Sequence, residues 1–412
     1  MGEPEIVNSL KAQKALILGR SQNSYIREHV LGIANAFSTA HFLSYVHIFG
    51  RLGPNRFEQW LSKLSQNYNF RWFFIDVMRF NFEISHRLLQ ELRDNGCRIV
   101  FLSFDNSSEQ DVVQYHYQLG DAVICTEPYS MYHFETMGIP TTNYKPSYRF
   151  EDFVNIEKDI DVSFVGWLKA DRKKFLAFVE KKGINISIAG KGSTVGKLSF
   201  SEFSSILARS RIGLNFTKTG HDPGTLQVNP GFTWRMMPKG RPVELALSRT
   251  FCLSEWCPEI GEIFDIGTEI DVFSTPEELV EKIEYYLSND KLREAMVERA
   301  FNRAVTEYLL PDAITRAVSH CALRIVSSQD RGLYIREQTY SLSNDFKLRL
   351  CFFYLVRMGK FLERGRFIES GQCFWRLGVH MFRGGVSLLF YSAYALVAKL
   401  SWYVDRIRIA QK

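Results

Sequence analysis

Short apolar runs alternate with segments of helical periodicity along most of this chain, and the alternation occurs twice. In the N-terminal part the strand candidates are Ala15–Gly19, Ser44–Phe49, Trp72–Val77, Cys97–Phe104 and Ala122–Thr126. Between the third and fourth runs, apolar residues recur at helical spacing, and Gly96 follows as a helix C-cap. Continuous apolar strands separated by helices are typical of a parallel sheet covered on both faces. The sequence therefore predicts a Rossmann-like N-terminal domain.

The same alternation restarts after the polar, acidic stretch Phe150–Asp161, which is the best candidate for a linker between domains. Ser199 and Glu202 have the spacing of a capping box, and Thr275 begins another helix. The elements expected here are strands at Asp161–Gly166, Ile184–Gly190, Arg211–Phe216, Thr250–Ser254 and up to Phe273, and helices at Asp171–Lys182, Ser201–Ser210 and from Thr275 onward. The fold class is α/β. The predicted domains are 1–152, 153–315 and a helical extension over 316–412, which has no strand signal.

Charge is distributed unevenly along the 412 residues, a length that suits two domains and an extension. The net charge is +6, yet residues 331–412 alone hold 14 Lys and Arg against five Asp and Glu. A basic, aromatic C-terminal segment on a mildly acidic body suggests a partner with an anionic surface. Membrane headgroups are the first candidate for this partner and nucleic acid is the second. Because no nucleic-acid recognition motif accompanies the charge, we predict a membrane surface and no nucleic acid.

Residues 384–398 carry no charge and lie between Arg383 and Lys399. This run is shorter than the roughly 18 to 20 residues that cross a bilayer. If the Lys399 side chain extends its ammonium group to the membrane surface, the apolar run continues to Val404. Segment 384–404 can therefore pack on the protein, lie on the membrane or span it, and the span is the least favoured of the three.

The termini and the cysteines indicate a cytoplasmic protein. The seven cysteines are scattered without zinc-site spacing, which is typical of reduced thiols. The N-terminus lacks the basic-then-apolar pattern of a signal peptide, and Ile6 breaks the myristoylation pattern that Met1-Gly2 begins. Together with the basic extension, this predicts a cytoplasmic protein that is peripheral at the inner face of the plasma membrane.

The stretch Lys239–Phe273 holds the strongest candidate for a binding site. It opens with a basic turn, Lys239-Gly240-Arg241, and continues into an apolar helix that carries a single carboxylate, Glu244. A nucleotide diphosphate needs cations for its pyrophosphate and a carboxylate for its ribose hydroxyls. Two alternatives stay open for Glu244, an ion pair with Arg241 and a solvated helix start. For the turn, the alternative is a basic surface loop.

Several segments resemble one family: DVSFVG at 161–166, Arg172, INISIAGKG at 184–192, RIGLNF at 211–216, and the stretch from Lys239 into the helix after Thr275. They are similar to the CgeB-like, spore maturation protein type of glycosyltransferase, a branch of the group-1 transferases, over about Asp161–Arg303. The resemblance implies the GT-B fold, with two Rossmann-like domains facing a cleft, the donor held mainly by the second domain and the acceptor by the first. In group-1 transferases the residue matching Glu244 binds the donor ribose. The second glutamate of that motif is here Met236, which weakens the expectation of a retaining mechanism.

Glycines and cations at two further strand ends complete the expected donor site. Gly166 ends one strand, and Lys169 and Arg172 follow it; Gly190 ends the next. A phosphate at the carboxyl end of a parallel strand would meet these groups. Asp159-Ile-Asp161 spells a D-x-D metal motif, but it opens a strand at a domain junction, and we predict no metal. GT-B enzymes balance the leaving diphosphate with side chains and helix dipoles, so we expect no cofactor besides the nucleotide-sugar.

The group that activates the acceptor hydroxyl is expected in the first domain, at or after the carboxyl end of a strand. Asp76 and Asp105 both meet this condition. Asp105 can equally serve as the N-cap of the following helix. His116 and His133 are weaker candidates, because a single histidine is more often structural.

The sequence thus predicts a metal-independent, hexosyltransferase-type glycosyltransferase that uses a nucleotide-diphosphate sugar. The acceptor would be a glycan or lipid-linked glycan of surface polysaccharide biosynthesis, such as an undecaprenyl-linked or lipopolysaccharide precursor. The alternative is a non-catalytic GT-B module that binds nucleotide-sugar or glycan as a scaffold, which Met236 favours. An NAD-dependent enzyme is disfavoured because LGRSQNSY, without a G-x-G-x-x-G, follows the first strand.

Overall fold

A computed structural model describes residues 3–19, 24–76, 84–104, 120–136, 138–168, 170–218, 236–329, 358, 361–362 and 365–383. The chain forms two compact units, Met1–Tyr144 together with Thr315–Lys412, and Lys145–Ile314. Unit 1 therefore contains both ends of the chain, and unit 2 is inserted between them. The sequence predicts divisions after residues 152 and 315, and the compact units divide after Tyr144 and Ile314, with Thr315–Lys412 grouped with the first unit.

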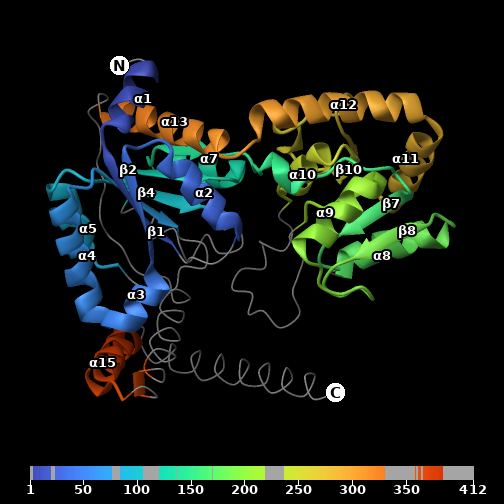
Figure 1. The fold of residues 1–412 in the computed structure, drawn as a ribbon. Coiled ribbons are helices and arrows are strands. Elements are labelled where there is room, and N and C mark those ends of the chain that lie inside the picture. Colours follow the sequence, from blue (N-terminus) through green and yellow to red (C-terminus); the bar gives the residue numbers. More distant parts are fainter. Residues whose placement is uncertain are drawn as a thin grey trace. The chain divides into compact units, whose positions relative to one another are not determined.

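Unit 1 is built on a six-stranded sheet in the order β2-β1-β3-β4-β5-β6, in which all neighbouring strands are parallel (Figure 1). The strands are β1 Lys14–Gly19, β2 Thr39–Ser44, β3 Trp72–Asp76, β4 Arg98–Ser103, β5 Ala122–Cys125 and β6 Thr141–Asn143. Strands β1, β3, β4 and β5 are buried along nearly their whole length, as their apolar runs predict.

The prediction of a strand at Ser44–Phe49 is wrong. The strand there is β2, which ends at Ser44, and residues Tyr45–Leu52 form helix α3. The buried residues Tyr45 and Phe49 are four positions apart, so they share one helical face that packs into the core. Strand β2 is at the sheet edge and only partly buried, which is why its own sequence lacks an apolar run.

The helices of unit 1 come from both ends of the chain. They are α1 Glu3–Lys11, α2 Ser24–Ala34, α3, α4 Pro54–Tyr68, α5 His86–Asp94, α7 Pro128–Thr136, α13 Asp312–Gln329 and α15 Phe367–Arg383. The Thr315 hydroxyl at the start of α13 donates to the Gly32 carbonyl at 2.9 Å, and Cys373 of α15 is buried in the same core as Phe361. The C-terminal segment thus supplies part of the packing of unit 1.

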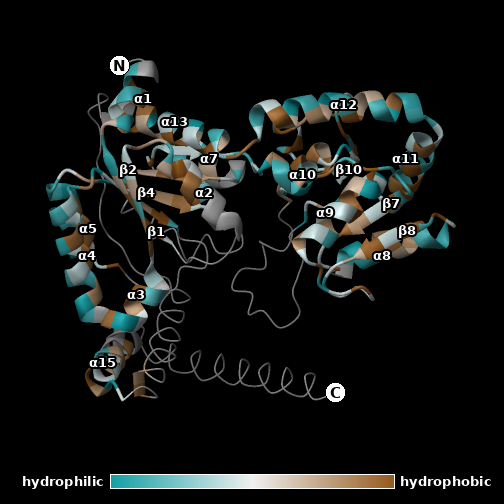
Figure 2. Cartoon of the chain, viewed as in Figure 1, coloured by the Kyte–Doolittle hydropathy of each residue, from teal (hydrophilic) through white to brown (hydrophobic). Residues whose placement is uncertain are grey.

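Unit 2 has a five-stranded, fully parallel sheet in the order β11-β10-β9-β7-β8. Its elements are β7 Ile160–Val165, α8 Ala170–Lys181, β8 Ile186–Ala189, α9 Phe200–Arg209, β9 Ser210–Asn215, α10 Arg241–Leu247, β10 Phe251–Glu255, β11 Asp271–Phe273, α11 Pro276–Ser288 and α12 Asp290–Glu307, with short 3₁₀ turns at Phe150–Asp152 and Ile260–Glu262. The strands of both sheets are largely hydrophobic (Figure 2). The capping box of Ser199 and Glu202 and the Thr275 N-cap are both confirmed.

Both sheets share one connection pattern. The first strand of each sheet (β1 or β7) lies between the second strand (β2 or β8) and the third (β3 or β9). The strand order therefore reverses beside the first strand of each sheet, which makes this position a topological switch point. In open parallel sheets, ligands bind at the carboxyl ends of the strands next to such a point. The places to examine are the ends of β7 and β9 in unit 2 and the ends of β1 and β3 in unit 1.

Among the helices that the structure describes, none combines the length and the apolar character that a membrane span requires. Segment 384–404, for which three roles stay open, lies outside the described residues.

Candidate functional site

The side chain of Arg172 lies at the switch point of unit 2. One guanidinium nitrogen, Nη1, donates to the Trp167 carbonyl just after β7, at 2.9 Å, and Nη2 donates to the Lys218 carbonyl just after β9, at 3.3 Å. The guanidinium also lies 5.9 Å from the ring centre of Phe164. Arg172, in the first turn of α8, therefore joins the two loops between which the rule for parallel sheets places a ligand.

Arg241 brings a second guanidinium to the end of β7. Its Nη2 donates to the carbonyl of Val165, the last residue of β7, at 2.7 Å, and its Nη1 is 2.5 Å from Glu244 Oε2. The ring centre of Phe203 lies 4.6 Å from the guanidinium carbon. The ion pair between Arg241 and Glu244, an alternative left open by the sequence, is thus present. Among the described residues, the structure gives Glu244 Oε1 no hydrogen-bond partner.

The carboxylate of Glu255 lies in the same region, and this residue is not among the donor-binding candidates that the sequence suggests. Glu255 is the last residue of β10 and is 3% exposed. Its Oε2 accepts from the backbone N–H groups of Thr217 and Lys218, at 3.0 and 3.1 Å. Its Oε1 is 3.1 Å from Lys218 Nζ. Glu255 therefore holds the loop after β9 and its lysine in place.

Among the residues that the structure describes, three cations and two carboxylates gather at this strand end. Arg172, Lys218 and Arg241 meet there with two carboxylates, Glu244 and Glu255. Burial lowers the pKa of the Arg172 guanidinium; Glu255 acts to raise that pKa and Arg241 to lower it. Because burial and like charge both disfavour the cation, an anionic ligand at this place would be stabilised by the same groups.

The glycines predicted after β7 and β8 allow a close approach of two backbones. Gly166 N–H donates to Ala189 O at 2.9 Å, and Leu168 N–H donates to Lys191 O at 2.8 Å. Gly190 has φ +113, and a Cβ there would lie 2.3 Å from the Gly166 carbonyl oxygen. Glycine is therefore needed at position 190 for the two loops to meet, whatever ligand they bind.

The rest of the predicted donor-side residues lie as follows. Gly240 faces Tyr148, since a Cβ there would be 1.9 Å from the Tyr148 hydroxyl oxygen. Lys239 is partly buried in the turn before α10. Lys169 lies outside the described residues. Met236, which replaces the second glutamate of the group-1 motif, forms an antiparallel bridge with Lys218, beside the cationic cluster.

In unit 1, Asp76 lies at the switch point. It is the last residue of β3 and is 2% exposed. It lies beside Gly19, the last residue of β1, because a Cβ added at Gly19 would be 3.6 Å from the Cβ of Asp76. Asp105 and His116 lie outside the described residues, and the side chain of His133 on α7 is likewise not described. The structure therefore places one of the two acid candidates at the predicted position.

The D-x-D carboxylates lie away from these strand ends. Asp159 pairs with Arg209 at 2.5 Å, and Asp161 with Arg211 at 3.2 Å, at the start of β7. Within the described ranges, no group of three or more His, Cys, Asp or Glu residues could hold a metal ion.

Comparison with known proteins supports the architecture. A family described as glycosyl transferase-like matches residues 172–317, whereas no curated protein matches the chain. A sucrose-phosphate synthase from Thermosynechococcus elongatus has TM-score 0.54 and 10% identity, over 77% of this chain and 100% of its own. A glycosyltransferase from Rickettsia africae has TM-score 0.52 and 9% identity, over 76% and 99%. The chain has the GT-B fold.

A third structure, Anabaena HepE in complex with UDP-glucose, has TM-score 0.48 and 10% identity over 78% of this chain and 100% of its own. The match to a glycosyl transferase-like family covers the C-terminal part of unit 2, which contains Arg172, Lys218, Arg241, Glu244 and Glu255. The CgeB-like subtype stays a prediction.

The close approach of Gly190 to Gly166 predicts a stability difference between two glycine substitutions. Gly190→Ala and Gly183→Ala both place alanine at positive φ, but nothing lies within 4 Å of a Cβ at Gly183. Gly183→Ala should cost roughly 1 to 2 kcal/mol of unfolding free energy from the left-handed backbone alone. Gly190→Ala should cost about 2 kcal/mol more, because the loops must also separate. Urea unfolding of the two variants measures this, and equal costs would contradict the close approach.

Proposed function

We propose that this protein is a metal-independent glycosyltransferase that transfers a sugar from a nucleotide-diphosphate donor to a glycan or lipid-linked glycan acceptor. The observation that carries the proposal is the cationic cluster of Arg172, Lys218 and Arg241 at the switch point of the unit 2 sheet. The GT-B fold and the glycosyl transferase-like match over 172–317 support it. On this proposal, unit 2 binds the donor.

The contacts suggest a role for each donor-side residue. Arg172 and Arg241 would bind the diphosphate oxygens, since guanidinium groups match phosphate geometry with paired donors. Lys239, Lys169 and Lys218 would add point charges. Glu244 would accept from the ribose hydroxyls through Oε1 while Oε2 keeps its contact with Arg241. Gly166, Gly190 and Gly240 would keep the surrounding loops close to the donor.

For the chemical step we propose Asp76 as the base that takes the acceptor proton, with Asp105 as the second candidate. A buried carboxylate at the end of a parallel strand has the position that such a base requires. The leaving diphosphate would be stabilised by the guanidinium groups of unit 2 without a metal ion. The second candidate function is a scaffold that binds nucleotide-sugar without turnover, which the replacement of a glutamate by Met236 beside Lys218 favours.

The acceptor side of the proposal includes an anionic membrane surface. Helix α15 packs through the buried Cys373, while its opposite face exposes Phe367, Ile368, Phe374 and Trp375 at 73%, 73%, 65% and 74%. These residues recur at i, i+1, i+7 and i+8, so they form one face of the helix. An exposed apolar face in a segment with a large excess of Lys and Arg suits the surface of anionic lipids. A polyisoprenyl-linked or lipopolysaccharide-type acceptor would be presented there.

Donor binding is tested by thermal unfolding of the full chain with UDP-, GDP-, ADP- and CMP-sugars. A ligand at about one hundred times its dissociation constant adds about 2.7 kcal/mol to stability, so one class of nucleotide should raise the melting temperature clearly. Arg172→Gln and Glu244→Gln should each weaken that binding about tenfold or more, because each removes a charge-assisted contact. Glu277→Gln, an exposed carboxylate on α11, is the matched control and should keep the full shift. If no nucleotide-sugar shifts the melting temperature, or if both site variants behave as the control does, the donor assignment is wrong.

Catalysis by Asp76 predicts a variant that binds donor but does not transfer. Asp76→Asn should lower the rate of sugar transfer by roughly 10² to 10⁴, the usual contribution of a general base, while the donor-induced melting shift stays unchanged. Asp105→Asn in the same assay identifies the base if Asp76→Asn keeps its activity. Donor binding by the wild-type protein without transfer to any glycan acceptor would favour the scaffold instead.

The exposed face of α15 predicts membrane binding that depends on two aromatic residues. Removing the whole extension would also delete the core residues Phe361 and Cys373, so point variants test the idea more cleanly. Phe374→Ser with Trp375→Ser should lower sedimentation with phosphatidylglycerol vesicles about tenfold or more, because two large apolar groups are lost. The control, Tyr285→Ser with Leu292→Ser, removes exposed apolar residues of unit 2 and should bind as the wild type does. Equal binding by the two double variants would exclude this face.

A further inference from the structure

Helix α9 begins at the edge of the unit 2 sheet where the proposed donor-binding groups lie. Between two parallel strands, a connecting helix begins near the carboxyl end of the first strand. Helix α9 follows β8 and leads into β9, and α10 follows β9 and leads into β10, so both begin at the carboxyl edge of the sheet. Leu207 of α9 and Val243 of α10 belong to one core cluster, so the two helices pack in the same layer (Figure 1).

Aromatic rings lead from Arg241 outward to solvent. Phe203, in the first turn of α9, has its ring centre 4.6 Å from the guanidinium carbon of Arg241. The ring centre of Phe200 is 5.7 Å from that of Phe203 and 6.4 Å from that of Phe153, which is buried. Phe200 itself is 51% exposed. Two neighbouring rings therefore support one aromatic side chain that solvent can reach.

Local contacts fix the position of this exposed ring. Phe200 is the first residue of α9, which begins with a capping box. The Ser204 hydroxyl donates to the Asp152 carbonyl at 2.8 Å, which ties α9 to the segment that carries Phe153. Because the Cα–Cβ bonds of a helix are tilted toward its N-terminus, the Phe200 side chain leans toward the carboxyl edge of the sheet. A ring that is already fixed loses little conformational entropy when a planar group stacks on it.

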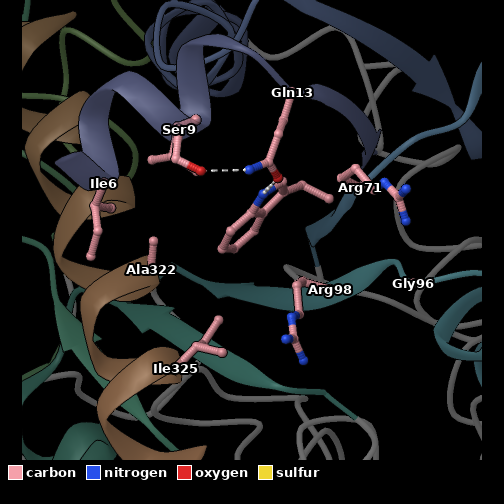
Figure 3. Close-up of a pocket in the computed structure, with 10 residues that line it drawn as sticks. Ile6, Ser9, Gln13, Arg71, Gly96, Arg98, Ala322 and Ile325 are labelled. Atoms are coloured by element: carbon pink, nitrogen blue, oxygen red, sulfur yellow. Dashed lines mark hydrogen bonds between the residues drawn. The ribbon is translucent and has the colours of Figure 1, made fainter. Parts of the chain in front are cut away.

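Two indoles elsewhere in the molecule are less suited to such stacking. The Lys191 ammonium group lies over the half-buried ring of Trp167, 3.5 Å from the ring centre. Trp72 lines a cavity of about 450 Å³ in unit 1, but it is 5% exposed and its Nε1 donates to Gln13 Oε1 at 2.8 Å. Figure 3 shows the next bond of this group, in which Gln13 Nε2 donates to the Ser9 hydroxyl at 2.9 Å. Compared with these two indoles, Phe200 is the more exposed ring.

We propose that Phe200 stacks on the base of the nucleotide-sugar donor. The inference rests on the proposed function, in which Arg241 binds the diphosphate and Glu244 the ribose. The base is the next group of such a ligand, and Phe200 is the exposed ring next to the one that packs on Arg241. Every nucleobase has a planar face, so stacking strengthens binding without selecting one base. Phe200 thus makes the site prefer a nucleotide-linked sugar to a simple sugar phosphate.

The test is calorimetric titration of the full-length protein with UDP, GDP, ADP and inorganic pyrophosphate, which has no base. Phe200→Leu keeps an apolar side chain but removes the aromatic face. It should weaken each nucleoside diphosphate that the wild type binds about tenfold and leave pyrophosphate binding unchanged. The matched control is Tyr285→Leu, which removes a 52% exposed ring from α11 of the same unit and should change neither affinity.

A second variant carries the test if Phe200→Leu does not fold. Phe200→Trp should keep nucleotide binding, and its added indole fluorescence should fall with a nucleoside diphosphate but not with pyrophosphate. Equal changes with both ligands, or equal nucleotide binding by Phe200→Leu and Tyr285→Leu, would overturn the stacking role while leaving the donor site in place. The same holds if only Trp256→Leu, which removes the 43% exposed ring after β10, weakens the nucleotides. If the wild type binds neither pyrophosphate nor any of the three nucleotides, the proposed function fails and this inference fails with it.

Discussion

The partly buried positive charge where β7 and β9 end is the constraint on which unit 2 depends. Arg172 can lie there only because the carbonyls of Trp167 and Lys218 face it and the carboxylate of Glu255 lies nearby. Removing such an ion from water costs several kcal/mol unless partners replace the lost solvent. The loop conformations and the positions of the charged groups are thus fixed together.

This constraint explains which site residues the sequence could reveal. Arg241 and Glu244 are three apart on one helix, so their proximity follows from local geometry. Glu255 interacts with Thr217 and Lys218, which are 38 and 37 positions away, and only the pairing of β9 with β10 brings them together. The one usable signal was a carboxylate at the end of an apolar strand, a position where an uncompensated charge is costly.

The fold was predictable where strands are buried on both faces and obscure where they are not. The runs of β1, β3, β4 and β5 are apolar over most of their length and were recognised. The partly buried edge strand β2 was missed, and its neighbour α3 was taken for a strand. A short apolar run fits a buried strand and a packed helix equally well. Likewise, composition identified the basic extension but not that Phe361 and Cys373 belong to the core of unit 1.

The two sheets have the same strand connections, and among the described residues their switch points carry different side chains, guanidinium groups in unit 2 and the Asp76 carboxylate in unit 1. Phosphate recognition, as proposed for unit 2, needs cations with donors left over from their protein contacts; Arg172 donates to two backbone carbonyls, and Arg241 is paired with one carboxylate, Glu244. A general base needs an oxygen lone pair that is not already accepting a hydrogen bond. Both carboxylate oxygens of Glu255 are occupied, Oε2 by the backbone N–H groups of Thr217 and Lys218 and Oε1 by the Lys218 ammonium group. A carboxylate placed within the cationic cluster would be paired in the same way and lost as a base. On the proposed function, a base on the second sheet would avoid pairing with the cations of unit 2, and Asp76 ends β3 of that sheet.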